Sequence, residues 1–179
     1  GVIKFKIRLK LLLTSMAITS YLYSINYLYT GIKYYLSFLD DESDQIRREQ
    51  IRDVMKYSWD SYKEYAWGYD FLNPQTRHGE NWYGLGYTII DSLDSLILME
   101  MDDEFYEAVN WINNSFPYLL PYAGEVSFFE TVIRSLGGLL TAYEQTHITL
   151  LLQIAKMIGD RLLPSFYTPT GLPRVLIHI

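Results

Sequence analysis

The chain has 179 residues, of which 49% are hydrophobic, so it is long enough to bury a sizeable core in one domain. Its formal net charge is −6, and no acid precedes Asp40, so the body of the chain is strongly acidic. An acidic body argues against nucleic acid as a partner, because phosphate binding needs a basic face. The lack of cysteine excludes disulfides and thiolate metal sites.

The N-terminus combines a basic flank with an uncharged run. Four basic residues come first: Lys4, Lys6, Arg8 and Lys10. Residues 11–32 carry no charge, and as a helix they would rise roughly 33 Å, enough to cross a bilayer core. The basic flank favours a cytoplasmic N-terminus and a single membrane span. We therefore predict a cytoplasmic tail at 1–10, a transmembrane signal anchor at 11–32, a stem at 33–45 and a body at 46–179 on the far side.

Two other interpretations of residues 11–32 stay open. The run contains Asn26 and several tyrosines, which makes it polar for a membrane span. It could instead be a cleaved signal peptide, or a helix that lies on a surface. An anchor and a cleaved signal both direct the body to the secretory pathway, which predicts an endoplasmic reticulum or Golgi location with the body in the lumen.

Beyond Asp40, apolar residues recur at three- and four-residue steps, which predicts helices. The first helix is expected to end near Ala66, with Gly68 as its stop, and residues 69–86 are rich in loop-forming residues. Further helices are predicted at 87–101, 103–113, 127–140 and 148–163. No segment alternates with period two for long enough to predict a strand. The body is therefore expected to be all-α, built from successive helical hairpins.

The predicted helix at 87–101 is apolar on nearly every side, yet it contains Asp91 and Asp94. These two residues share a face, and a helix that is apolar all round is normally buried. Carboxylates in such a helix should be paired or should line a polar cavity. The alternative is a helix-dipole effect with partial exposure, and the pattern leaves both open.

The stretch "SFFETVIRSLGGLL", residues 127–140, places Glu130 and Arg134 four residues apart in an otherwise apolar or small run. An ordinary exposed ion pair is one explanation. The adjacent Gly137 and Gly138 argue against it, because each costs about 1 kcal/mol in a helix interior relative to alanine. Two such residues indicate that another backbone or side chain approaches closely, as in helices packed around a central space.

Four ordered motifs resemble the class I α-1,2-mannosidases, glycoside hydrolase family 47. They are "YKEYAWGYDFLNP", "GLGYTIIDSLDSLILM", "FFETVIRSLGGLLTAYE" and "GDRLLPSFYTPTGLP". The resemblance runs from near Arg48 to Pro173. It implies an (αα)7 barrel, of which this chain is the N-terminal part, and the trimming of high-mannose N-glycans in the secretory pathway. The "TRHGENW" loop departs from the family pattern, so His78 and Glu80 receive no role.

The resemblance also implies site residues. Glu130 falls on the family's general acid, which protonates the leaving glycosidic oxygen. Arg134 falls on an arginine that contacts the glycan, Asp91 on a supporting carboxylate, and Asp94 is expected to bind substrate. We expect Phe128 and Phe129 to disfavour the charged form of Glu130 and Arg134 to favour it.

The family inverts configuration and uses Ca²⁺, held partly by a threonine near the end of its domain. Neither a water-activating carboxylate nor a metal ligand can be assigned in this chain, and both are expected beyond residue 179. Arg174 stands where the family usually has tyrosine, and "VLIHI" lacks the usual polar continuation. Three functions stay open: the N-terminal part of a mannosidase, a non-hydrolytic glycan-binding relative in quality control, or an inactive truncated member.

Overall fold

The computed structural model describes residues 22–23, 25–37 and 42–179, and the chain divides into two compact units, 1–54 and 55–179. In the first unit, residues 25–37 are helical and their tyrosines are exposed. Within the predicted anchor at 11–32, positions 11–21 and 24 lie outside the described residues. Among the residues that the structure does describe, no helix is both long and apolar enough to cross a membrane.

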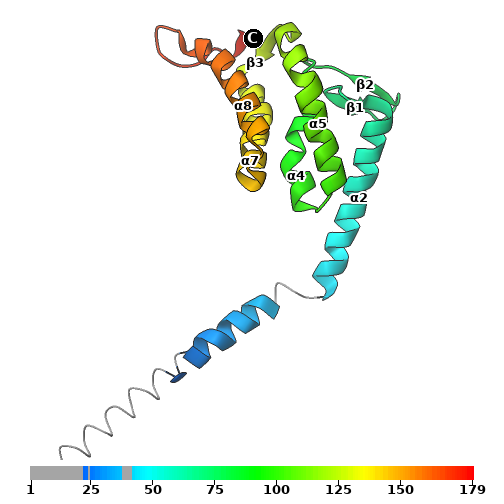
Figure 1. The fold of residues 1–179 in the computed structure, drawn as a ribbon, viewed down its shortest axis with the longest axis vertical. Helices are drawn as coiled ribbons and strands as arrows, with labels where there is room; N and C mark the ends of the chain where they lie inside the picture. Colours follow the sequence, from blue (N-terminus) through cyan, green and yellow to red (C-terminus); the bar gives the residue numbers. More distant parts are fainter. Residues whose placement is uncertain (1–21, 24, 38–41) are drawn as a thin grey trace, which may run out of the picture. The chain divides into compact units, whose positions relative to one another are not determined.

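The second unit is mostly helical and is coloured from cyan to red in Figure 1. Helix α2 (Glu42–Ala66) enters it from the N-terminal side. The elements that follow are β1 (Phe71–Asn73), β2 (His78–Glu80), α3 (Tyr87–Asp91), α4 (Leu93–Leu98), α5 (Asp102–Leu119), η1 (Leu120–Tyr122), β3 (Glu125–Ser127), α6 (Phe128–Glu130), η2 (Thr131–Leu136), α7 (Gly137–Thr146), α8 (Thr149–Leu162), η3 (Leu163–Phe166) and β4 (Leu176–His178).

The predicted helical class is confirmed, and within the described residues the structure adds four short strands that the sequence pattern did not predict. Strands β1 and β2 form an antiparallel hairpin, and β3 pairs antiparallel with β4, which is formed by the "VLIHI" tail. Each strand has three residues, too few for an alternating pattern to emerge from the sequence. The β1–β2 turn is held by the Asn73 side chain, whose Oδ1 accepts hydrogen bonds from the backbone N–H groups of Gln75 and Thr76.

Two of the predicted helices are interrupted. The range 87–101 forms α3 and α4, which are separated by a turn at Ser92. The range 127–140 forms three consecutive pieces, of which η2 is a π-helix. The other predictions agree more closely: α5 is longer than its predicted range, and α8 matches the predicted range within a residue at each end.

The core of the second unit lies between α4, α5, α7 and α8. Helix α4 packs against both α5 and α7, and α7 packs against α8. Figure 1 shows α4 beside α5 and α7 beside α8. Fully buried side chains come from each of these elements, including Leu93, Leu96, Ile112, Leu139 and Ile158. The expectation that the 87–101 segment is largely buried is confirmed, since α3 and α4 contribute residues such as Ile89 and Ile90 with no exposed surface.

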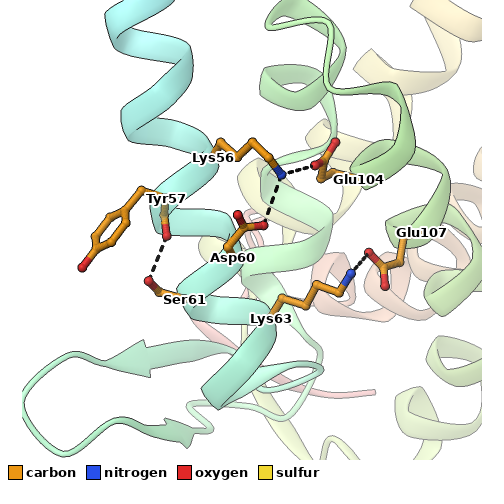
Figure 2. Close-up of polar contacts among 7 residues, drawn as sticks. All are labelled: Lys56, Tyr57, Asp60, Ser61, Lys63, Glu104 and Glu107. Atoms are coloured by element: carbon orange, nitrogen blue, oxygen red, sulfur yellow. Dashed lines mark hydrogen bonds and ion pairs between the residues drawn. The ribbon is translucent and has the colours of Figure 1, made fainter.

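Helix α2 is attached to α5 by ion pairs beside a buried aromatic cluster. Figure 2 shows Lys56 and Lys63 of α2 reaching the carboxylates of Glu104 and Glu107, at N···O distances of 2.7 Å in each pair. The hydrogen bond from Lys56 lowers the pKa of Glu104. Beneath these pairs, Trp59 and Tyr62 are buried, so hydrophobic packing and charge pairing both hold α2 in place.

Candidate active site

Arg134 joins two of the predicted carboxylates. Its Nε donates to Glu130 Oε2 at 2.7 Å, and one of its terminal nitrogens, NH1, donates to Asp91 Oδ2, also at 2.7 Å. The hydrogen bond to Glu130, together with that to Asp91, raises the pKa of Arg134, although partial burial acts in the opposite direction. The Glu130 side chain is 20% exposed, against 39% for Asp91 and Arg134. An arginine is well suited to this bridge, because its planar fork presents several donors at fixed angles.

The helix that carries Glu130 and Arg134 begins at a side-chain cap. Ser127 is the N-cap, and its hydroxyl accepts a hydrogen bond from the Glu130 backbone N–H at 3.3 Å. The Thr131 hydroxyl donates back to the Ser127 carbonyl at 2.8 Å. The helix then widens into the π-helix η2, which contains Arg134. Short π segments often occur at functional sites, and the helical periodicity of residues 127–140 does not indicate this one.

The two glycines after η2 have different surroundings. A Cβ atom on Gly138 would lie 2.7 Å from the Ile90 carbonyl oxygen, so α7 and the end of α3 are in backbone contact there. The predicted close approach is therefore confirmed for Gly138. A Cβ atom on Gly137 would meet only Val132 O, at 3.4 Å, within the same helical run. Gly138 thus allows the backbone that bears Asp91 to approach the helix that bears Arg134.

The two aromatic residues next to Glu130, Phe128 and Phe129, differ in burial. Phe128 is half-buried and meets Phe166 edge-on, with ring centroids 5.4 Å apart. Phe129 is 63% exposed, so it does not enclose Glu130 in an apolar pocket. The expected influence of the two rings on Glu130 therefore stays a prediction.

The fourth predicted site residue, Asp94, has a different hydrogen-bond partner from the residues of the Arg134 bridge. Asp94 is on α4, where its carboxylate accepts a hydrogen bond from the neighbouring Ser95 at 3.3 Å. The shared face inferred for Asp91 and Asp94 assumed one continuous helix, and the turn at Ser92 interrupts it. Glu80, to which the sequence assigned no role, accepts a hydrogen bond from Asn73 within the β1–β2 hairpin.

A hollow of about 200 Å³ adjoins the Arg134–Asp91 pair. Its lining residues are Asp70, Phe71, Trp82, Tyr87, Thr88, Asp91 and Arg134. Trp82 is 54% exposed and stacks on Tyr83, with ring centroids 4.9 Å apart. Aromatic rings beside hydrogen-bonding groups are suited to a sugar, which presents both apolar C–H faces and hydroxyls. A larger hollow of about 520 Å³ between α2 and the β1–β2 hairpin contains neither Glu130 nor Asp91.

Sequence reasoning missed Asp70. This residue is 3% exposed, and its carboxylate accepts five backbone hydrogen bonds. Oδ2 bonds the N–H groups of Trp82, Tyr83 and Gly84, and Oδ1 bonds those of Leu85 and Tyr87, at distances from 2.6 to 3.2 Å. The one available signal was an acid placed before a glycine-rich turn, which is a common pattern in exposed loops.

The described part of the chain was also compared with the usual side-chain metal sites. Within 22–23, 25–37 and 42–179, no group of three or more histidine, aspartate or glutamate side chains is placed to hold an ion. These residues alone therefore do not fit the calcium site that the resemblance implies, and no chemical step is assigned to a metal here.

Asp91 lines the small hollow, and Glu130 is joined to it through Arg134. Glycoside hydrolases use a pair of carboxylates at the scissile bond, so the arrangement is compatible with that class of enzyme. The chain belongs to glycosyl hydrolase family 47, whose sequence profile matches residues 54–179. The resemblance drawn from the four motifs is thus confirmed.

Named relatives agree with this membership. The chain is 43% identical over 141 residues to mannosyl-oligosaccharide 1,2-alpha-mannosidase MNS1 of Arabidopsis thaliana, covering 78% of this chain and 25% of that protein. It is 43% identical over 143 residues to human mannosyl-oligosaccharide 1,2-alpha-mannosidase IC, covering 76% of this chain and 22% of that one. The chain therefore spans about a quarter of the length of these relatives.

A solved structure gives the same result for the fold. The chain is similar to an alpha-1,2-mannosidase from Trichoderma reesei, with a TM-score of 0.64 and 28% sequence identity. The match covers 74% of this chain and 30% of that structure.

Proposed function

We propose that this chain supplies the N-terminal part of an (αα)7-barrel α-1,2-mannosidase that removes terminal mannose from high-mannose N-glycans. The observation that carries the proposal is the Arg134 bridge, which gathers Glu130 and Asp91 beside the hollow lined by Trp82 and Tyr87. Membership of the family and the names of its relatives supply the reaction and the substrate class.

In this proposal, Glu130 is the general acid. Arg134 Nε bonds Oε2, so Oε1 is the oxygen that would carry the proton to the departing sugar oxygen. Inversion requires a second carboxylate about 6.5–9.5 Å from the first, to activate water on the opposite face of the ring. Arg134 would contact the glycan, and Asp91 would keep Arg134 in place. Calcium dependence is part of the proposal, with ligands from outside the described residues.

The reaction itself provides the first test. The full-length protein, incubated with an α-1,2-linked mannose oligosaccharide, is expected to release mannose that appears first as the β-anomer in proton NMR, since inversion of an α-linkage gives that product. Chelation with EDTA should stop the release, and added Ca²⁺ should restore it. Binding of the oligosaccharide without release would instead favour a glycan-binding relative. If the protein shows no binding of the oligosaccharide and no release of mannose, the result would favour an inactive family member.

The proposed location is the lumen of the endoplasmic reticulum or Golgi, with residues 11–32 as a type II signal anchor. We expect the body to resist added protease in sealed microsomes and to be digested once detergent is present. Asn113 of the sequence Asn113-Asn114-Ser115 is exposed on α5 and offers a second reporter, because glycosylation there requires exposure to the lumen. Digestion of the body in sealed vesicles would contradict this topology.

A further inference from the structure

The shape of residues 82–87 depends on one buried carboxylate. Asp70 satisfies five backbone N–H groups of this segment, which would otherwise lack partners as the chain turns from β2 into α3. Its own backbone carbonyl accepts from the N–H and the hydroxyl of Thr88, at 3.1 and 2.7 Å. An asparagine would have the same shape but a single acceptor oxygen, so it could keep only one of the two groups of bonds.

The segment held by Asp70 reaches the helix that carries Glu130. The Tyr87 hydroxyl lies 3.0 Å from Thr131 Oγ1, and Thr131 has no exposed surface. Because the Thr131 hydroxyl hydrogen is donated to the Ser127 carbonyl, Tyr87 must be the donor in this contact. Burial raises the pKa of Tyr87 to about 12, in agreement with a protonated hydroxyl that can donate.

The same segment also forms a wall of the hollow beside Arg134. Trp82 and Tyr87 both line that hollow, and the Asp70 carboxylate bonds the backbone N–H of each. A displacement of residues 82–87 would therefore move the aromatic wall and loosen the contact with Thr131, the residue that follows Glu130.

We infer that Asp70 is a positioning residue of the site: through residues 82–87 it places the Trp82 wall, and through Tyr87 and Thr131 it fixes the helix turn that presents Glu130. This inference rests on the proposed function for its catalytic consequence. Its structural part, the coupling of the segment to the helix, is independent of that function.

The coupling is tested by hydrogen exchange in the full-length protein, with Asp70→Asn and Tyr87→Phe compared with wild type. Asp70→Asn is expected to accelerate amide exchange in peptides covering 82–87 and also in those covering 128–136. Tyr87→Phe, which removes one oxygen and keeps the ring, should accelerate exchange at 128–136 only. Asp53→Asn, the same change at an exposed position of α2, serves as the control and should change neither.

The catalytic consequence is tested by separating kcat from KM. Tyr87→Phe and Thr131→Val should each lower kcat about tenfold, with KM changed less than twofold, because a small misplacement of a reacting group is costly. The double variant should lose no more than Thr131→Val alone, since that substitution already removes the contact with Tyr87 as well as the hydrogen bond to the Ser127 carbonyl. Thr131→Ser keeps the hydroxyl and should retain kcat. The Tyr87 and Thr131 variants test the link between residues 82–87 and the Glu130 helix even if Asp70→Asn does not fold.

Two results would overturn the inference. One is unchanged exchange at 128–136 in both Asp70→Asn and Tyr87→Phe. The other is wild-type kcat in Tyr87→Phe and Thr131→Val. A wild-type protein that releases no mannose would instead contradict the proposed function, and the exchange at 128–136 would then decide the inference alone.

Discussion

Glu130→Gln in the full-length protein is expected to reduce the rate of mannose release from an α-1,2-linked oligosaccharide by about 10²–10⁴-fold, because removal of a positioned proton donor typically has that effect. Glutamine keeps the shape of the side chain and an oxygen that can accept from Arg134 Nε, so the bridge between Glu130 and Asp91 is retained in part. Glycan affinity, measured by calorimetry, should therefore stay close to that of wild type.

Arg134→Ala provides the contrasting variant. It removes both hydrogen bonds of the bridge and the proposed contact with the glycan, so affinity should fall together with rate. Arg134→Lys keeps the charge but cannot reproduce the two directed bonds of the guanidinium group, so it should not restore the wild-type rate. Unchanged mannose release by Glu130→Gln would show that another residue is the general acid.

Gly138→Ala is expected to lower the free energy of unfolding by about 1–3 kcal/mol, as overpacking of a close contact usually does. The added methyl group would lie 2.7 Å from the Ile90 carbonyl oxygen, and a backbone atom cannot move aside as a flexible side chain can. Relief requires α7 to move away from the end of α3, which would also separate Arg134 from Asp91. Urea denaturation of the full-length protein, together with its rate of mannose release, measures both effects.

The neighbouring glycine is the matched control. At Gly137 the backbone is helical and the nearest atom to a Cβ would be 3.4 Å away, so Gly137→Ala should be neutral or stabilising by up to about 1 kcal/mol. Equal destabilisation by the two substitutions would contradict this prediction, because helix propensity favours alanine at both positions and only Gly138 is in close contact with Ile90.

The helices were predictable from the sequence because each buries an apolar face at helical spacing, as α8 does with Leu151, Ile154 and Ile158. The three-residue strands were not, because their pairing is determined by backbone hydrogen bonds and not by a side-chain pattern. Family motifs identified Glu130, Arg134 and Asp91, and the structure brings these three together.

The role of Asp70 and the π-helical form of η2 could not be predicted from sequence patterns. An aspartate before a glycine-rich turn has the same appearance whether it is solvated or buried, and only the fold shows that five N–H groups converge on it. The π-helix keeps helical spacing within its apolar surroundings, so periodicity does not distinguish it from an α-helix. The break at Ser92 was missed for a related reason, since nothing in the residue pattern marks it, and the substrate-binding role of Asp94 stays a prediction.

The pairing of β3 with β4 affects the order in which the site can form during synthesis. Val126 lies opposite Ile177, and the Phe128 backbone N–H donates to the Val175 carbonyl at 2.9 Å, two residues before Glu130, the proposed general acid. Strand β3, which leads into the helix bearing Glu130, thus pairs with β4, and β4 leaves the ribosome well after that helix. Closing a loop of this length is slow compared with forming a helix. The nascent chain therefore carries Glu130 and Arg134 before the strand pairing that fixes their helix exists, and this part of the site is completed only after translation has passed residue 178.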